Sequence, residues 1–232
     1  MEIKELLFMV ADLWMIFAGF FYGWKFIRRY QNYLLGLEWM IVATSGTNFL
    51  IWSAIKGSED GLMFKFACFL DAFSRSVGIT LILVMGLMRV THRYKPTLAT
   101  DIGVFVLATI AGLYFQQFHA HFALGPATYY VVVNVATSLF LIYFAGRLWA
   151  VGEKVKTVGT LAATAAGFAI AITYDFFPIP GDDELRTIFY TAALATWGTQ
   201  LWMYFLGYRA LHNHNEAADA RPARREQSAA GA

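Results

Sequence analysis

The chain has 232 residues, of which 58% are hydrophobic and 17% aromatic, while only 15% are charged. Soluble domains carry about 25% charged residues, so this composition excludes an ordinary soluble domain and predicts an integral membrane protein. The formal net charge of +2 decides little, because a membrane protein is oriented by the side on which its charges lie. We expect the lipid bilayer as a partner and no nucleic acid.

Cysteine and leader patterns narrow the class further. Cys68 is the only cysteine, so neither a disulfide within one chain nor a thiolate metal cluster is expected. The first apolar run has acidic residues before it and basic residues after it, without a small-residue cleavage site. We therefore interpret this run as the first membrane span and not as a cleaved signal peptide.

Seven segments are long and apolar enough to cross a bilayer, which requires about 20 mostly apolar residues. They run approximately from Leu6 to Ile27, Leu34 to Ile55, Leu62 to Val90, Leu98 to Phe118, Pro126 to Ala150, Val155 to Phe177 and Leu185 to Leu211. Short loops predict antiparallel neighbours, so residues 1–212 are expected to form one all-α seven-helix membrane domain. Residues 213–232 are polar and alanine-rich, which predicts a disordered tail.

The basic residues predict the orientation of the bundle. They gather at four sites that fall on one side: Lys25, Arg28 and Arg29; Arg89, Arg93 and Lys95; Arg147, Lys154 and Lys156; and Arg209, Arg221, Arg224 and Arg225. The other side is rich in acids, namely Glu2, Glu5, Glu59, Asp60, Asp182, Asp183 and Glu184. The positive-inside rule then places the amino terminus outside and the carboxyl terminus in the cytoplasm, for a multi-pass protein of the inner (plasma) membrane.

A weak internal similarity suggests duplication of three helices around a linker helix. An Arg-x-x-His motif starts at Arg89 and again at Arg209, about 120 residues later. Two glycine pairs with equal spacing, Gly23 with Gly36 and Gly146 with Gly159, bracket loops at a similar offset. Such a 3+1+3 parallel arrangement is similar to that of SWEET-type sugar transporters, in architecture only. Glycine and arginine are common at helix ends, so a chance match stays open.

The third predicted span carries two charges where lipid-facing residues are expected. Asp71 and Arg75 are four residues apart, so they lie on one face of a helix and can pair. A charge near the middle of a membrane costs at least about 3 kcal/mol on insertion scales, and such residues normally face a bundle interior or a wet cavity. The pair is thus the leading candidate for a functional site.

Further polar residues fall at a comparable depth when depth is counted at about 1.5 Å per residue. These are Asn48, Thr196, Gln200 and, somewhat further out, Asn134 and Asp12. Together with Asp71 and Arg75 they predict a ligand-binding pocket in the outer half of the bundle, with Arg75 near its floor. The alternative is that each of them only ties helices together, because amide and hydroxyl side chains commonly bond between membrane helices.

Several chemistries are disfavoured by the residues present. The five histidines lie at predicted span ends, in the loop with His119 and His121, or near His212, so neither a bis-histidine haem nor a histidine-rich di-iron centre is expected. The seventh span has no lysine for a retinal Schiff base. No catalytic residue and no metal ligand is assigned, and the cofactor, if any, is undetermined.

The leading hypothesis for function is an inner-membrane transporter of a small polar or anionic solute, with proton coupling and homo-oligomerisation left open. A ligand sensor that passes a helix shift to its cytoplasmic loops is the first alternative. An intramembrane enzyme acting on a lipid or isoprenoid is the second, with Asp71 or Glu38 as acid or base. Nothing in the sequence pairs a nucleophile with a base, which ranks this reading last.

Overall fold

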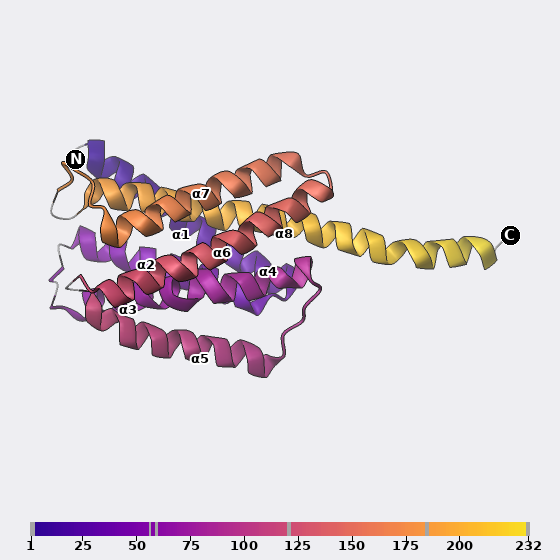
Figure 1. Cartoon of the computed structure of the whole chain (residues 1–232), viewed down its shortest axis with the longest axis horizontal. Helices are drawn as coiled ribbons and strands as arrows, with labels where there is room; N and C mark the ends of the chain where they lie inside the picture. The colour runs from indigo at the N-terminus through magenta and orange to yellow at the C-terminus, as the bar shows by residue number, and fades with distance from the viewer. Residues whose placement is uncertain (1–2, 56, 59, 120–121, 184–185, 231–232) are drawn as a thin grey trace.

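The computed structural model describes residues 3–55, 57–58, 60–119, 122–183 and 186–230, with side chains through residue 220. These residues form an all-helical bundle of seven helices, the third of which changes its helix type along its length (Figure 1). The elements are α1 (Ile3–Tyr30), α2 (Tyr33–Ala54), α3 (Leu62–Phe73), η1 (Ser74–Ile82), α4 (Leu83–Thr91), α5 (Leu98–Phe115), η2 (Gln116–Phe118), α6 (Leu124–Ala150), α7 (Lys154–Phe176) and α8 (Thr187–Ala230). The expected Glu2, Glu59, Glu184, His121 and the span start at Leu185 lie outside the described residues.

Six of the described helices are long and apolar enough to cross a membrane. They are α1, α2, the continuous helix Leu62–Thr91, Leu98–Phe118, α6 and α7, and they identify a multi-pass membrane protein. The seventh expected span is present as the first half of α8, which is not among the six. Threonines, a glycine and Gln200 lower its hydropathy, and it packs lengthwise against α1 and α7, where a helix can carry more polar residues than one that faces lipid.

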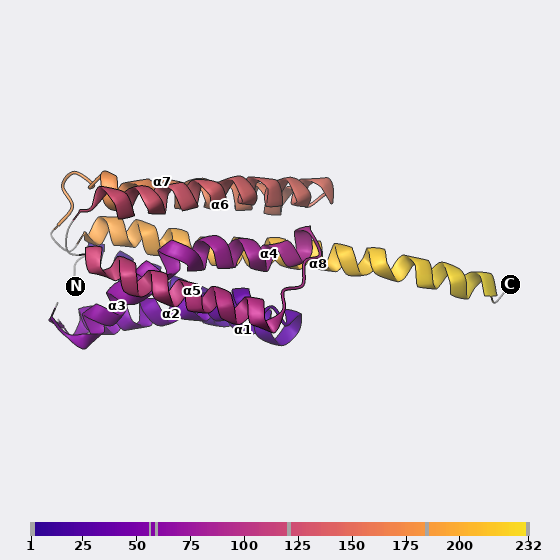
Figure 2. The same ribbon diagram turned by 60° about the horizontal axis from the view of Figure 1, so that its bottom comes forward.

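Helices that follow each other in the chain pack as antiparallel pairs, α1 with α2 and α6 with α7, and α8 joins the two pairs. The most extensive contacts join α1 to α2, α1 to α8, α6 to α7 and α7 to α8 (Figure 2). At the α1–α2 crossing a side chain on Gly19 would meet the Trp39 carbonyl oxygen at 2.6 Å, so the two backbones approach through glycine. In contrast, α5 packs mainly against α3 and η1, and against α6 through the Phe115 ring, which contacts Tyr129 and Tyr130. It leaves side chains such as Ile110 exposed for contact with lipid.

The third helix is π-helical through its middle. Its segment η1 has nine residues with i→i+5 hydrogen bonding, flanked by the α-helical α3 and α4. Longer π-helical segments are rare and frequently mark functional sites. Ser76 and Thr80 donate their hydroxyls to the backbone carbonyls of Phe73 and Ser76, and the Tyr129 hydroxyl of α6 donates to the same Ser76 carbonyl at 3.1 Å. The sequence analysis did not predict this change of helix type.

The start of α8 is capped by the loop before it. One Asp182 carboxylate accepts hydrogen bonds from the backbone N–H groups of Ile188 and Phe189, both at 2.9 Å. Asp183 accepts one from the Thr187 N–H at 3.0 Å and pairs with Lys4 of α1 at 3.1 Å. The Thr187 backbone N–H, together with Lys4, lowers the pKa of Asp183 from its ordinary value. Two residues expected only to contribute negative charge therefore also satisfy the helix terminus.

At the other end of the chain, α8 differs from expectation. The segment 213–232 was expected to be disordered, yet α8 continues unbroken to Ala230 and projects beyond the bundle (Figure 1). Its first part is tied back to the bundle, because Asn215 donates to the Val90 carbonyl at 2.9 Å and Asp219 pairs with Arg93 at 2.7 Å. These contacts give the polar sequence partners that its composition alone does not reveal.

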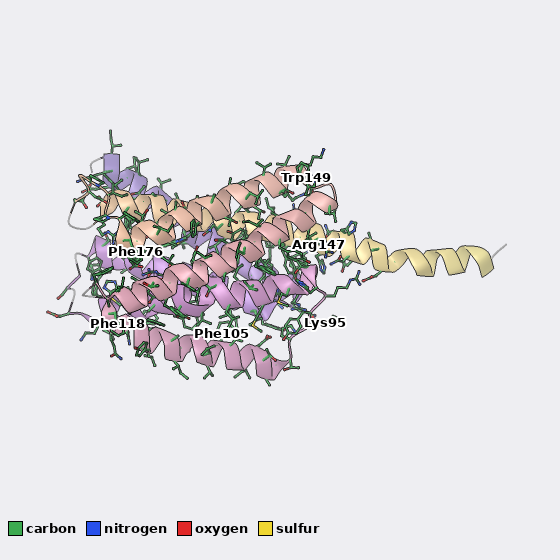
Figure 3. All side chains as sticks on the ribbon, in the orientation of Figure 1. Lys95, Phe105, Phe118, Arg147, Trp149 and Phe176 are labelled. Atoms are coloured by element: carbon green, nitrogen blue, oxygen red, sulfur yellow. The ribbon has the colours of Figure 1, made fainter. Side chains whose placement is uncertain are left out.

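The two ends of the bundle differ in chemistry. Figure 3 shows Lys95 and Arg147 at the end from which α8 projects, and Phe118 and Phe176 at the opposite end. The two glycine pairs that suggested a repeat pack differently: a side chain on Gly23 would meet the Gly36 carbonyl at 2.9 Å, whereas one on Gly146 would meet nothing within 4 Å. The pairs therefore give no structural support for duplication.

Candidate ligand-binding site

Arg75 is at the centre of a cluster that ties three helices together. Its guanidinium donates to Asp175 at the end of α7 and to Asp71 of α3, with a distance of 3.5 Å to the Asp71 carboxylate. The Tyr174 and Tyr130 rings lie on its faces, with their centroids 3.7 Å and 4.0 Å from the guanidinium carbon. Cation–π contacts of this kind contribute about 0.5–2 kcal/mol each.

Burial makes this cluster costly to disrupt. The side chains of Arg75, Asp175 and Asp71 are only 12%, 19% and 23% exposed. Two carboxylates facing one guanidinium leave the cluster with a formal charge of −1, in a part of the bundle where an isolated charge is unfavourable. The cluster therefore offers one guanidinium that can bind an anionic group and two carboxylates that can bind a cation.

Two cavities meet at this cluster. The larger, here called the vestibule, has a volume of about 340 Å³ and opens towards the end of the bundle that carries the α5–α6 and α7–α8 loops. Its polar lining consists of Asp71, Arg75, Gln116, His119, Tyr130, Tyr174, Asp175, Arg186 and Tyr190, and Cys68 also lines it. It therefore presents both carboxylates and both guanidinium groups to one space.

The smaller cavity, here called the inner cavity, lies deeper and has a volume of about 80 Å³. Its lining combines aromatic rings with uncharged polar groups: Trp39, Tyr130, Asn134, Thr137, Ser138, Thr164, Tyr174, Trp197, Gln200 and Tyr204. Gln200 donates to the Tyr204 hydroxyl at 3.0 Å and to the Ala163 carbonyl at 3.2 Å, which fixes its amide across the α7–α8 interface. A space of this size accommodates a few waters or a small polar group.

Arg75, Tyr130 and Tyr174 line both cavities. The stacked cluster therefore forms the partition between the vestibule and the inner cavity.

The structure brings four of the seven expected site residues to these cavities: Asp71, Arg75, Asn134 and Gln200. Asn48 instead donates to the Met63 carbonyl at 2.9 Å and ties α2 to α3, which is the interhelical role considered as the alternative. Thr196 is half-buried on α8 and lines neither cavity. Asp12 is fully buried on α1 against Gly46, away from both.

Three important site residues escaped the sequence analysis: Asp175, Tyr174 and Tyr130. Asp175 lies near the end of its span, where a carboxylate is expected to lie at the membrane interface. Only the fold shows that it pairs with Arg75. Its position two residues inside the predicted end at Phe177 was the available signal. The aromatic rings carried no signal, because most tyrosines in this composition face lipid or core.

No group of three potential metal ligands gathers anywhere in the part of the chain that the structure describes. No protein-family model, curated protein or solved structure matches this chain.

Proposed function

We propose that this protein is a membrane transporter for a small polar or anionic solute. The observation that carries the proposal is that Arg75, Tyr130 and Tyr174 form the shared wall of two cavities lying one behind the other in the bundle. Transport by alternating access requires a binding region near the middle of the membrane and a barrier that can open on one side. A stacked, doubly paired arginine supplies such a barrier together with a recognition group.

Recognition of the solute would begin in the vestibule. A carboxylate or another anionic group competes most easily with Asp71, whose 3.5 Å contact to Arg75 is longer than that of Asp175. Arginine binds carboxylates through two parallel hydrogen bonds, so it can hold an incoming anion while it keeps one aspartate. Asn134 and Gln200 of the inner cavity then provide amide groups for the uncharged polar part of the solute.

Orientation and location are part of the proposal. The basic sites at the end from which α8 projects favour a cytoplasmic carboxyl terminus in the inner (plasma) membrane, and with that orientation the vestibule would face outside. A reporter fused after His212 should read cytoplasmic, and one inserted at residues 57–61 should read external. An external carboxyl terminus would reverse the direction of the proposed pathway. The parallel 3+1+3 duplication and homo-oligomerisation stay predictions.

A flux measurement tests the proposal. Purified protein in proteoliposomes is screened with a panel of small carboxylates, amino acids and sugars, first by ligand-induced thermal stabilisation and then by uptake of the labelled hits. A ligand at a hundred times its dissociation constant adds about 2.7 kcal/mol of apparent stability. Arg75→Gln should abolish uptake, whereas Arg93→Gln, which alters an exposed arginine of the α4–α5 loop, should leave it unchanged. Binding without flux in the wild type would contradict transport.

One observation favours a ligand sensor as the second candidate. The single helix α8 contributes Tyr190 to the vestibule and Gln200 to the inner cavity, and then continues without a break to Ala230. A ligand that shifts Gln200 would therefore move a rigid rod that leaves the bundle. Binding without flux, combined with a ligand-dependent change in the protease sensitivity of residues 213–230, would favour this candidate.

A further inference from the structure

A second buried carboxylate lies apart from the Arg75 cluster. Glu38 of α2 is 0% exposed, and neither of its carboxylate oxygens has a hydrogen-bond partner among the described protein groups. An ionised carboxylate without a partner is very costly in a low-dielectric interior, whereas the neutral acid costs much less. Its retention inside a membrane bundle therefore calls for a role beyond packing.

The room for Glu38 is created by the π-helical segment. A methyl group built at Gly78, in the middle of η1, would collide with both the Oε1 atom and the Cδ atom of Glu38. The Ser74 hydroxyl, one turn earlier on η1, approaches the same carboxyl and likewise completes no hydrogen bond of normal geometry. The acid is thus seated against the π-helical segment of the bundle.

Among the described residues, no charged side chain acts on the Glu38 carboxyl. The elements packed most extensively against α2 are α1, α3, η1 and α4, and α8 also reaches it, because Trp39 donates to the Leu201 carbonyl and Phe49 contacts Tyr190. The charged side chains of the four elements have other neighbours. Two of them form ion pairs, namely Lys4 with Asp183 and Arg75 with Asp71 and Asp175. Three lie over aromatic rings: Lys25 over Phe21, Arg28 over Trp24 and Arg29 over Tyr30. Of the others, Arg89 donates to the Gln31 carbonyl, Asp12 packs against Gly46, and Lys65 is exposed. The rings of Tyr22 and Tyr30 of α1 contact Phe205, and the Tyr204 hydroxyl of α8 is hydrogen-bonded to Thr164 and Gln200. The charge state of Glu38 is therefore set by burial and by the Ser74 hydroxyl.

Glu38 is nevertheless close to the transport pathway. Trp39, the next residue on α2, and Ile79, the residue after Gly78, both line the inner cavity. Arg75 is three residues before Gly78 on the same π-helical segment. A change in the size or charge of the Glu38 carboxyl thus acts on the segment that carries the partition between the two cavities.

We infer that Glu38 is a proton-binding site whose occupancy is coupled, through η1, to the opening of the Arg75 partition. Proton binding by Glu38 does not depend on the proposed transport function, but its purpose does, because the proton would then be the coupling ion of transport. In the state described here the carboxyl is sealed and holds its proton. When the inner cavity opens to water, Glu38 loses that proton to the solvent, and the resulting carboxylate, now hydrated, cannot return to its dry seat against Gly78 until it binds a proton again.

The first test needs no solute. Infrared difference spectra against pH are recorded for the protein in lipid nanodiscs, and the carbonyl-stretch band of protonated carboxyl groups is followed. Glu38→Gln, which is neutral and of the same size, should remove one band that disappears with rising pH in the wild type. Asp12→Asn, which alters the other fully buried carboxylate without a partner, should leave that band in place. A spectrum unchanged by Glu38→Gln, or a Glu38 band that never titrates in the folded protein, would overturn the inference.

The single cysteine reports on coupling. Cys68 lines the vestibule but is only 8% exposed, so its alkylation rate by a maleimide rises when that space opens. The informative quantity is the alkylation rate of the wild type divided by that of Glu38→Gln at each pH, because Glu38→Gln keeps the same thiol and reagent. We expect this ratio to change several-fold across the titration of Glu38. Ser74→Ala should move the midpoint of that change to higher pH, because the ionised Glu38 carboxylate loses a nearby donor. A ratio that stays at one would refute coupling.

The two proposals fail in different ways. If acid-driven uptake persists in Glu38→Gln proteoliposomes, the protein is a transporter and the inference is wrong. If the infrared band and the Cys68 ratio behave as expected but no solute crosses, the proton site stands and transport is wrong.

Discussion

Removal of the Arg75 guanidinium is the perturbation whose consequence can be worked out most fully. Arg75→Leu leaves Asp71 and Asp175 facing each other without a cation at 23% and 19% exposure. Loss of one partner from a buried ion pair costs about 3–5 kcal/mol, and we take the lower end because both aspartates border the vestibule. Two cation–π contacts add roughly 1 kcal/mol in total at their exposed-site values.

The expected loss is therefore about 4 kcal/mol. At roughly 2–4 °C per kcal/mol for a chain of this length, the midpoint of thermal unfolding in detergent should fall by about 8–16 °C. The two aspartates should differ: Asp175→Asn is expected to cost more than Asp71→Asn, because Asp71 makes only the 3.5 Å contact. Arg93→Leu, the exposed control, should cost no more than about 1 kcal/mol.

Combined variants make the test sharper. The sequence alone suggests that replacing both Asp71 and Arg75 with apolar residues restores stability, but the structure shows that Asp175 would then remain buried and unpaired. We expect the double variant Arg75→Leu/Asp71→Leu to stay destabilised, and the triple variant that adds Asp175→Leu to recover most of the loss. Recovery in that double variant, or an Arg75→Leu protein as stable as Arg93→Leu, would refute the three-residue cluster.

Three further predictions follow from individual contacts. Gly78→Ala should destabilise the bundle by about 1–3 kcal/mol through its collision with Glu38, and Glu38→Ala on the same chain should relieve much of that loss in chemical unfolding curves. Tyr174→Phe should unfold like the wild type because the ring over Arg75 is kept, whereas Tyr174→Leu should be less stable by at least about 1 kcal/mol; equal losses would point to the hydroxyl. The lowered pKa of Asp183 implies a stabilisation that is complete above the ordinary value of 3.8 and is lost as the pH falls through the lowered pKa, so Asp183→Asn should flatten the acid limb of the unfolding-temperature profile.

The class of molecule and its central helix follow from the sequence alone. Apolar runs of about 20 residues are imposed by the thickness of the hydrocarbon core, which is why the helices Leu62–Thr91 and Leu98–Phe118 could be located closely without a fold. A charged pair at i and i+4 inside such a run identifies Asp71 and Arg75 as unusual for the same reason, since lipid does not tolerate them. The sequence also predicts which end of the bundle is basic.

Only the tertiary structure decided which helices face one another, and therefore what each polar residue does. Helical periodicity assigns a residue to a face but does not name the neighbour of that face, so Asn48 reads as a pocket residue although it bonds to the Met63 carbonyl. For the same reason Asp175 reads as interfacial although it is the principal partner of Arg75. Glu38 is the strongest case: its role depends on a π-helical segment and a glycine 40 positions later, and neither the helix type nor the contact is encoded in any local pattern.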